Sequence, residues 1–470
     1  MSDSRPVVTR IAPSPTGSMH IGTARTALFN YLYAKHTGGR FLLRIEDTDR
    51  DRSTEAAVQV IFDGLDWLDL PFDGEPVFQF AQADRHREVV MALLAADKAY
   101  RCWLSGDELT AARDKAHAAG HALRSPWRDR EPDEADLALP HAIRFRGPLN
   151  GDTVVSDLVQ GDVTFRNRDL DDLILLRSDG APTYNLAVVV DDHDMGITHI
   201  IRGDDHLNNA ARQCLIYQAL DWDLPAFAHV PLIHGPDGAK LSKRHGAQAV
   251  GDFQTLGYLP EAMRNYLSRL GWSHGDDEIF SDDQAIAWFD IADVNKGAAR
   301  LDWDKLNFVN AHYIRQADDD RLTALVAEVF TRRDEALDEA GLATVRRAIP
   351  LVKERARTIV ELADQLGFLF RARPVPLDDK ARGLLTDDTR TRLARLRGVL
   401  AEANDWGAEA LEALLKAFAE SEGVGFGKFA PALRATLTGG AASPDLGRTL
   451  SALGRDESLA RLDDALSPAA

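Results

Sequence analysis

The stretch from residue 13 to residue 23, Pro-Ser-Pro-Thr-Gly-Ser-Met-His-Ile-Gly-Thr, constrains the fold more than any other part of the chain. An apolar run at residues 7–12 precedes it, and apolar residues at helical spacing follow it at residues 24–36. This order predicts a strand, a tight loop and a helix. Prolines hold such a loop in a fixed non-helical path, and Gly22 lets a ligand approach the backbone. Because a helix start offers unpaired N–H groups, the stretch predicts a phosphate-binding loop.

His20 lies in this loop, just before the expected helix. An imidazole placed there can donate a hydrogen bond to the negative charge that develops on phosphorus when a phosphate reacts. The alternative is an ordinary strand-to-helix turn that carries a surface histidine, and His20 alone does not decide between the two.

The first 80 residues alternate between strand-like and helix-like runs. Strands are predicted at residues 7–11 and 41–45, and helices at residues 24–36 and 53–68, the last with a capping start at Ser53. A βαβα pattern of this kind predicts a parallel sheet that binds ligands at the carboxyl ends of its strands.

The middle of the chain interrupts this pattern. Two helices and then three short strands are predicted, at residues 84–99, 106–119, 143–146, 152–155 and 162–166. Strand-like runs return at residues 186–190, 199–201 and 229–233. We therefore expect a nucleotide-binding sheet that is split by an insertion.

The second half of the chain has a different character. Residues 253–310 are mostly helical in pattern, and from about residue 318 the chain is almost all helical, with breaks near residues 373–376 and 423–425. Cys102 and Cys214 are the only cysteines, too few for a disulfide framework or a four-cysteine zinc site. No apolar run approaches the roughly 20 residues that span a bilayer. We expect a cytoplasmic protein with no membrane partner.

The charge of the chain is distributed unevenly. A formal charge of −19 over 470 residues argues, taken alone, against a polyanionic partner. Residues 341–400, however, hold thirteen basic and seven acidic side chains. Such a segment is either a surface for nucleic acid or a solvated helical face.

A second motif, Lys-Leu-Ser-Lys-Arg at residues 240–244, follows a turn at residues 235–238. Together with the stretch around His20, it resembles the HIGH and KMSKS signatures of class I aminoacyl-tRNA synthetases. Three further stretches narrow the resemblance to glutamyl-tRNA synthetases, at residues 12–17, 25–28 and 44–49. Thr23 stands where the first signature has its second histidine, which removes one phosphate donor.

The resemblance implies an α/β fold: a Rossmann-type parallel sheet split by an α+β insertion, followed by all-α stem-contact and anticodon-binding domains. The expected parts are a catalytic domain at residues 1–80 and 186–238, an insertion for the tRNA acceptor end at 81–185, a stem-contact domain at 239–318 and anticodon-binding domains at 319–373 and 374–470.

The implied reaction joins L-glutamate to tRNA through a glutamyl-adenylate, with release of AMP and pyrophosphate, in a monomeric enzyme. His20 and Lys243 are the expected catalytic residues. The expected ATP contacts are Pro13, Thr16, Gly17, His20, Gly22, Thr23, Asp205, His206, Lys240, Leu241, Ser242, Lys243 and Arg244. ATP brings Mg²⁺, held mostly by phosphates and water.

Glutamate needs cations for its two carboxylates and an acceptor for its ammonium group. Arg10 lies in an otherwise apolar strand, where an arginine is costly unless it is paired, and Arg202 ends another apolar strand. By resemblance, the glutamate contacts are Arg10, Ala12, Ser14, Glu46, Tyr184 and Arg202. How the carboxylates divide between the two arginines is left open. Arg44 and Asp47 are expected in an internal salt-bridge network.

The resemblance favours the anticodon arm of tRNA as the partner of the basic segment. The expected contacts are Arg346, Arg347, Arg355 and Arg357. A solvated face remains the alternative. Which helical residues read the anticodon, whether glutamine tRNA is also charged and whether activation requires tRNA are left open.

Two candidate metal sites are not expected to bind metal. Residues 191–194, Asp-Asp-His-Asp, are predicted to form a turn whose adjacent carboxylates point in different directions. Many members of the family carry zinc in the insertion through a Cys-x-Cys pair, but here Leu104 takes the second position after Cys102. No zinc is therefore expected.

Three rival assignments make different demands on the sequence. A cofactor adenylyltransferase shares the signature histidine but is short and lacks an arginine-rich helical half. A non-catalytic tRNA-binding relative should have lost His20 or Lys243, and neither is lost. A glutaminyl-tRNA synthetase should have a β-barrel where residues 320–470 show no strand alternation.

Overall fold

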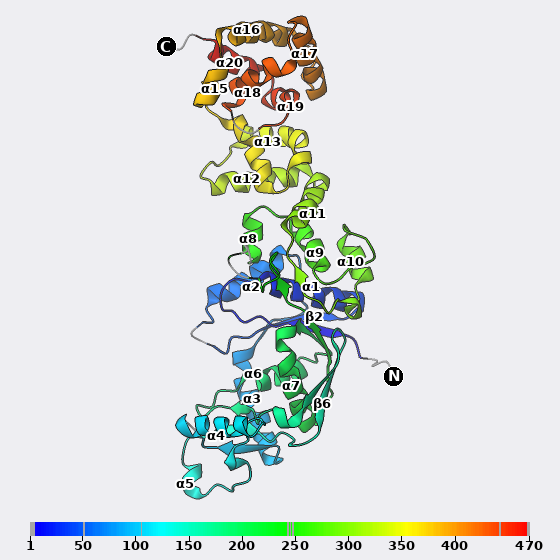
Figure 1. The fold of residues 1–470 in the computed structure, drawn as a ribbon, viewed down its shortest axis with the longest axis vertical. Helices are drawn as coiled ribbons and strands as arrows, with labels where there is room; N and C mark the ends of the chain where they lie inside the picture. The colour runs from blue at the N-terminus through cyan, green and yellow to red at the C-terminus, as the bar shows by residue number, and fades with distance from the viewer. Residues whose placement is uncertain are drawn as a thin grey trace. The chain divides into compact units, whose positions relative to one another are not determined.

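The computed structural model describes residues 5–49, 52–104, 106–241, 244, 246, 249–440 and 443–467. The chain divides into two compact units. The first comprises Met1–Phe253 and Met263–Asp302, and the second comprises Gln254–Ala262 and Trp303–Ala470. Among the described residues, the strands belong to the first unit (Figure 1).

The first unit is built on parallel strands. β1 (Val8–Ile11) pairs with β2 (Arg40–Ile45), which pairs with β3 (Val77–Phe78). β9 (His199–Gly203) pairs in parallel with β10 (Ala226–Val230). The amide of Thr198 donates to the carbonyl of Val8 over 3.0 Å, which brings β9 beside β1. The predicted parallel sheet is confirmed, and the carboxyl ends of β1 and β9 meet at one edge.

The hairpin β6 (Asp152–Asp157) and β7 (Gly161–Arg166) was expected in the insertion, yet it extends this sheet. β6 pairs in parallel with β10 and antiparallel with β7. The alternating pattern of the two strands predicts a hairpin from the sequence. Its pairing with β10 is not predicted, because β10 lies about 70 residues away and leaves no local signal.

The remaining insertion forms an antiparallel sheet of β4 (Ala99–Cys102), β5 (Ala142–Phe145) and β8 (Ile174–Leu176), accompanied by α4 (Gly106–Ala118) and α5 (Glu134–Leu137). One hydrophobic core joins this sheet to the parallel one: Phe145, Ile200 and Phe227 belong to the same buried cluster. The insertion is therefore packed onto the sheet that it interrupts.

The helices of the sheet follow the prediction closely. α1 (Ile21–His36) begins at the expected loop, and α2 (Glu55–Trp67) is capped by Thr54, whose hydroxyl accepts from Ala57 N over 3.2 Å. The predicted cap, Ser53, is thus one residue too early. α3 (Ala83–Ala95) ends before the predicted residue 99, because the chain reverses at Asp97, with φ of 54°, and then enters β4.

The run at residues 186–190 was predicted as a strand and residues 191–194 as a turn, and both predictions are wrong. The structure has one helix, α6 (Tyr184–Asp194), which carries buried side chains on several faces. A short apolar run that is buried all round has no periodicity, so it reads equally as a central strand or as a core helix. The last turn of α6 places Asp191 and Asp192 in the core.

The rest of the first unit completes the site. α7 (Leu207–Ala219) follows β9, and the short strand β11 (Ile233–His234) pairs in parallel with β12 (Ala299–Arg300). The boundaries of the two units fall within α8 (Val250–Thr255) and α9 (Pro260–Arg269). α10 (Asp282–Trp288) has a capping box at Ser281.

The second unit is helical throughout its described residues. Its helices are α11 (Trp303–Gln316), α12 (Asp319–Arg332), α13 (Glu339–Val352), α14 (Ile359–Leu366), α15 (Asp379–Leu384), α16 (Asp387–Glu402), α17 (Ala408–Ser421), α18 (Ala430–Thr438), α19 (Leu446–Leu453) and α20 (Arg455–Leu466). Breaks fall after Phe370 and after Ser421, near the two predicted positions.

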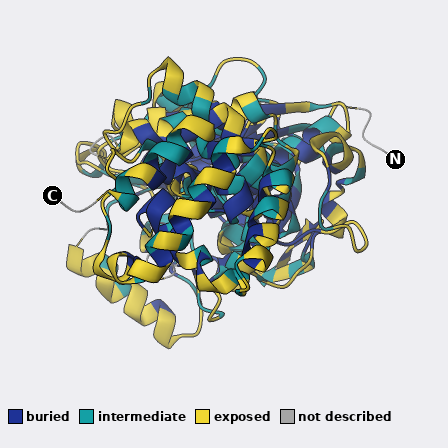
Figure 2. Ribbon diagram, turned by 90° about the horizontal axis from the view of Figure 1, so that it is seen from above, coloured by how far each residue is buried: buried dark blue, intermediate teal, exposed yellow. Residues whose placement is uncertain are grey.

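The helices of this unit bury leucine-rich faces against one another and expose their other faces, as Figure 2 shows by the alternation of dark blue and yellow along the ribbons. This amphipathic pattern explains why so long a segment needs no sheet to make a core. Within the described part of the chain, no helix has the length and apolar character needed to cross a membrane.

Candidate active site

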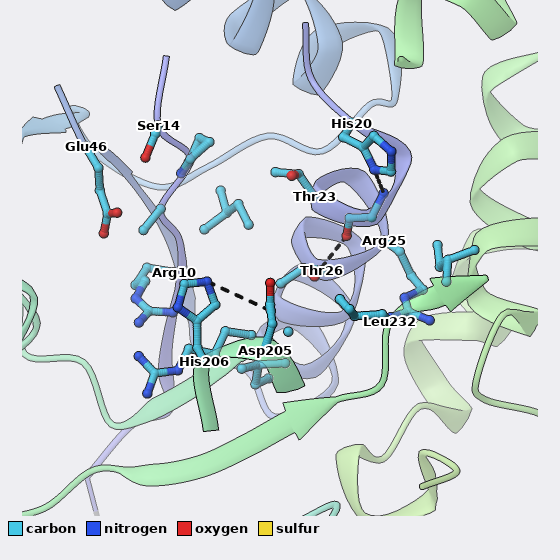
Figure 3. A pocket seen from close by; sticks show the side chains of 18 of the residues that line it. Arg10, Ser14, His20, Thr23, Arg25, Thr26, Glu46, Asp205, His206 and Leu232 are labelled. Carbon is cyan, nitrogen blue, oxygen red and sulfur yellow. Dashed lines mark hydrogen bonds and ion pairs between the residues drawn. The ribbon is translucent and has the colours of Figure 1, made fainter. Parts of the chain in front are cut away.

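A cavity of about 520 Å³ opens where β1 and β9 end, and its lining comes from segments far apart in the chain (Figure 3). It brings together fourteen of the residues selected from the sequence: Arg10, Ala12, Pro13, Ser14, His20, Gly22, Thr23, Glu46, Tyr184, Arg202, Asp205, His206, Lys240 and Leu241. In Figure 3, Ser14 and Glu46 lie on one side of the cavity, and His20 and Thr23 on the other. A cavity thus lies at the strand ends where the sequence predicts a ligand site, and its occupation by a ligand stays a prediction.

Five of the residues selected as ATP contacts are not part of this lining. Thr16, Gly17 and Arg244 are described but do not line the cavity, and Arg244 donates to Asp237 over 2.8 Å. Ser242 and Lys243 lie outside the described residues.

His20 is the N-cap of α1. Its Nδ1 accepts a hydrogen bond from the amide of Gly22 over 3.1 Å. A backbone amide can only donate, so a neutral His20 ring carries its proton on Nε2. A Cβ at position 22 would lie 3.3 Å from Nδ1, which explains the glycine there. The ring is thus held in the tautomer that can donate a hydrogen bond from Nε2.

Backbone hydrogen bonds connect the segment around the second motif to the loop that holds His20. Lys240 forms an antiparallel bridge with His234, and Ala249 forms one with His20. The amide of Val250 donates to the carbonyl of Met19 over 2.9 Å. Lys240 and Leu241 therefore line the cavity, and Ala249 pairs with His20, although the two motifs are more than 200 residues apart in the sequence.

Arg10 already has a carboxylate partner inside the protein. Its Nε donates to Oδ1 of Asp192 over 3.0 Å, and its Nη2 donates to Oδ2 over 3.1 Å. The two arginines Arg10 and Arg44 hold the pKa of Asp192 at about 2, despite its burial. The sequence indicated that Arg10 needs a partner but could not show that α6 supplies one.

Arg44 forms the predicted internal network. Its guanidinium lies 2.5 Å from Asp192, 3.1 Å from Glu46 and 3.8 Å from Asp191. Asp47, predicted to belong to an internal network as well, accepts a hydrogen bond from the amide of Phe80 over 2.8 Å, and its place in a salt-bridge network stays a prediction. Burial raises the pKa of Glu46, and the charge of Arg44 opposes that rise.

The carboxylates at the end of α6 point to different partners, as predicted, although they lie on a helix. Besides the two arginines of Asp192, Asp191 accepts from Gln79 over 2.7 Å and lies 2.6 Å from His86, while Asp194 accepts from Arg85 over 2.9 Å. No group of three or more histidine, cysteine or acidic side chains among the described residues is arranged to hold a metal ion.

Arg202 differs from Arg10 because its partners are neutral. Its Nε donates to Nε2 of His229 over 3.0 Å, and its Nη2 donates to Oε1 of Gln213 over 2.8 Å. Its Nη1 is buried and has no hydrogen-bond partner among the described residues. Burial lowers the pKa of Arg202 from its ordinary value. The cavity is therefore lined by a buried cation with an unused donor.

Tyr184 and His206 form part of the rim. The Tyr184 hydroxyl lies 3.1 Å from Nδ1 of His206, and Nε2 of His206 lies 4.0 Å from the carboxylate of Asp205. Burial, and then the charge of Glu46, raises the pKa of Tyr184 to about 12. Burial lowers the pKa of His206. Figure 3 shows His206 beside Asp205 at the cavity.

Arg25 lines the cavity, and the sequence analysis did not select it. Its Nη1 donates to the carbonyl of Leu270 over 2.7 Å, and its Nη2 donates to the carbonyl of Pro231. Burial lowers its pKa to about 10. The available signal was an arginine on an otherwise apolar face of the helix that follows His20. Thr26 and Leu232 also line the cavity and were not predicted, because an isolated hydroxyl or apolar side chain belongs to no recognisable motif.

Cys102 lies in a packed polar environment. Its Sγ accepts from Nε of Arg144 and lies 3.3 Å from both that atom and Oγ of Ser125. Trp103, the next residue, packs on Trp127 with ring centroids 4.6 Å apart. Protein groups therefore surround the sulfur, and the absence of zinc stays a prediction.

The arginines selected for tRNA lie in the second unit, and three of the four face carboxylates. Arg346 lies 2.5 Å from Asp320, Arg357 lies 2.5 Å from Glu361, and Arg355 lies 3.9 Å from Asp445. Arg347 donates only to the hydroxyl of Thr344, over 3.1 Å, among the described residues. All four are exposed.

Family models match both parts of the chain. Residues 6–308 match the model described as the catalytic domain of class I tRNA synthetases (E and Q), and residues 321–466 match an anticodon-binding domain.

Similar proteins match over nearly the full length. A glutamate–tRNA ligase of Caulobacter vibrioides is 65% identical over 100% of both chains, and one of Phenylobacterium zucineum is 63% identical over 99% of both. A crystal structure of a glutamate tRNA ligase from Elizabethkingia meningosepticum, in complex with its amino acid, matches with a TM-score of 0.85 at 32% identity, over 98% of this chain and 99% of that one. A glutamate-tRNA synthetase from Elizabethkingia anophelis matches with a TM-score of 0.82 at 31% identity, over 99% and 100%.

Proposed function

We infer that the chain, which belongs to the glutamate–tRNA ligase family of class I tRNA synthetases, joins L-glutamate to tRNA with consumption of ATP. The α-carboxylate of glutamate attacks the α-phosphorus of ATP, pyrophosphate leaves, and the glutamyl-adenylate forms. A hydroxyl of the terminal tRNA adenosine then attacks the activated carbonyl, and AMP leaves.

One observation carries this assignment of the cavity. The His20 loop, the start of the second motif and Arg202, which has one unpartnered donor, all line the same space. Two anions must meet there, so positive charge and placed donors are what the reaction requires. A surface turn with an incidental histidine would not explain this convergence.

Each group has a proposed task. His20 donates from Nε2 to the phosphate oxygens, where negative charge develops in the transition state. Lys240 and Lys243 bring positive charge to the phosphates, with Pro13, Gly22, Thr23, Asp205 and His206 around the nucleotide. Lys243 lies outside the described residues, so its task rests on the motif and on the position of Lys240.

The glutamate end of the cavity is assigned to Arg10, Ala12, Ser14, Glu46, Tyr184 and Arg202. Glu46, as a carboxylate, accepts from the ammonium group of the substrate. Arg202 offers its unpaired Nη1 to a substrate carboxylate, because a buried guanidinium donor without a partner is costly. Arg10, whose charge Asp192 offsets, contributes a donor rather than a free charge.

Mg²⁺ is proposed to enter with ATP. The described residues offer no cluster of acidic or imidazole ligands for it. Magnesium in such sites keeps water molecules and substrate phosphates as its ligands, so the protein need not supply a cage.

The second unit is proposed to bind the anticodon arm of tRNA, in keeping with the anticodon-binding match at residues 321–466. The boundaries predicted from the sequence, with an acceptor-end insertion at residues 81–185 and a stem-contact domain at residues 239–318, are kept as part of this proposal. The enzyme is expected to act in the cytoplasm as a monomer.

ATP–pyrophosphate exchange with L-glutamate, run with tRNA present, tests the proposal. Lys243→Ala should lower the exchange rate by roughly a hundred- to a thousandfold, the usual effect of losing one transition-state donor. Lys416→Ala, which removes an exposed lysine of α17, should leave the rate unchanged. An unchanged rate in Lys243→Ala would remove the second motif from the mechanism.

A further inference from the structure

A chain of three buried side chains crosses the sheet behind the cavity. Arg202, His229 and Asp157 lie on the adjacent strands β9, β10 and β6. His229 pairs with Arg202 in the backbone register, and their side chains meet over 3.0 Å. Nδ1 of His229 lies 2.6 Å from Oδ2 of Asp157, and both of these side chains are fully buried.

The partners decide the tautomer of His229. Nε of Arg202 can only donate, so Nε2 of His229 accepts and carries no proton. The proton of the neutral ring therefore lies on Nδ1 and is donated to Asp157. Asp157 is itself fixed in place, because it also accepts from the amides of His229, Val159 and Gln160 over 2.8–3.1 Å.

This arrangement leaves the charge of Arg202 available. Its two acceptors, the His229 ring and the Gln213 amide, are neutral. Asp157 does not contact Arg202 directly, because His229 lies between the two side chains. A carboxylate bonded directly to Arg202 would offset its charge, as Asp192 does for Arg10. Two of the three nitrogens of Arg202 are hydrogen-bonded, so the orientation of the guanidinium group, Nη1 included, is fixed.

We propose that Asp157 and His229 are positioning residues that hold Arg202 as an oriented, charge-available guanidinium for a carboxylate of the amino acid substrate. This inference rests on the proposed function of the cavity. It assigns to two residues, neither of which lines the cavity, a direct effect on glutamate binding and none on ATP binding.

Protonation of His229 breaks the arrangement. An imidazolium has two donors and no acceptor, so it cannot accept from Arg202, and two cations then face each other. The charged groups that face His229 are Asp157 from β6, Arg202 from β9 and Asp204 beyond the end of β9, while Phe227 stacks on its ring. Burial and Arg202 lower the pKa of His229, and Asp157 opposes this change. The site is therefore intact at neutral pH, and it fails only at a pH below the ordinary pKa of an imidazole, because the pKa of His229 is lowered.

The test measures the KM for glutamate and the KM for ATP by exchange between pH 5.5 and 8. His229→Gln keeps the pattern of one donor toward Asp157 and one acceptor toward Arg202, but it does not titrate. It should bind glutamate nearly as well as the wild type at pH 8 and lose most of the rise in KM at acid pH. His229→Leu removes the acceptor and should raise the KM for glutamate about tenfold at every pH, with the KM for ATP unchanged.

His274→Gln is the control, because His274 is exposed, bonds Asp277 and stacks on Trp288, outside the cavity. It should follow the wild-type profile. His206 also titrates at the cavity, and its contribution remains in both His229 variants. Thermal unfolding of each variant shows whether the protein is still folded, and so separates unfolding from a displaced Arg202 side chain. If His229→Leu does not fold, the acid limb in His229→Gln decides alone.

Nitrogen NMR of labelled histidines gives a readout that needs no substrate. It should show a neutral His229 protonated on Nδ1 at pH 7.5. An Nε2-protonated ring, or equal changes in both KM values, or an acid limb in His229→Gln as large as that of the wild type would overturn the proposal. A wild-type enzyme that shows the Nδ1 tautomer but no exchange with glutamate would contradict the proposed function instead.

Discussion

The arginines of the cavity and those of the helical unit differ in how their charge is used. Arg202 and Arg25 are buried, and they donate to a ring nitrogen, an amide oxygen and backbone carbonyls. Arg395 is exposed and Arg397 is half-buried, and each lies within hydrogen-bonding distance of a carboxylate, on Glu422 and Asp463 respectively. The net charge of a segment therefore does not show where positive charge is available.

The basic segment illustrates the point. Its thirteen basic residues exceed its seven acidic ones, but several of its arginines pair with acids from other parts of the chain, such as Asp320, Asp463 and Asp464. In a chain of −19, Arg202 in the cavity has no directly bonded carboxylate among the described residues. Its charge is available because Arg202 is buried among neutral partners, and the composition of the chain does not reveal this.

The largest effect is expected at Asp192, because this carboxylate offsets the charges of two buried arginines, Arg10 and Arg44. Asp192→Asn should cost about 3–5 kcal/mol of stability, the usual loss when a buried ion pair keeps only its cations. Urea unfolding at pH 7 measures this loss. A loss below about 1 kcal/mol would mean that Arg10 and Arg44 do not depend on it.

The pH dependence of the same group has a definite sign. The pKa of Asp192 in the folded protein is about 2, below the ordinary value of about 3.9. Its contribution to stability is therefore full above the ordinary value and is lost as the pH falls toward 2. Asp192→Asn should lack this part of the acid dependence, which urea unfolding at pH 3 and pH 6 would show.

Arg202 tests the cavity side directly. Arg202→Gln should raise the KM for glutamate roughly a hundredfold, since a hydrogen bond between charged groups is lost while the KM for ATP is retained. Arg321→Gln, which opens an ion pair with Glu261 in the second unit, is the matched control and should leave both values unchanged. Equal loss of both substrates in Arg202→Gln would make Arg202 structural.

How far these features could be predicted depends on the range of the contacts that produce them. The strand, loop and helix around His20 follow from local pattern, as do the helices of the second unit. Residues 186–190 were wrongly predicted as a strand, because a helix that is buried on all sides shows no helical periodicity of apolar residues. The Asp192 partner of Arg10 is 182 positions away, and Asp157 is 72 positions from His229. Nothing local marks such pairs, so the site could be selected by motif but its charge balance could not.

The smallest effect concerns the exposed arginines. Arg347 has no carboxylate partner among the described residues, whereas Arg357 lies against Glu361. Arg347→Ala should reduce the slope of log affinity for tRNA against log salt by roughly one unit, and Arg357→Ala by less, because its counter-charge is already present. Filter binding of tRNA across salt concentrations measures both. Equal reductions would show that surface ion pairs open when tRNA binds, and no change in either would favour a solvated face.

The most direct test of the account is a crystal structure of this chain with L-glutamate bound. Because Nη1 of Arg202 is a buried guanidinium donor without a partner among the described residues, a carboxylate oxygen of the ligand should lie about 2.7–2.9 Å from it. Arg10 should keep both of its contacts with Asp192. A structure in which glutamate occupies the cavity while Nη1 of Arg202 contacts no ligand oxygen would contradict the account.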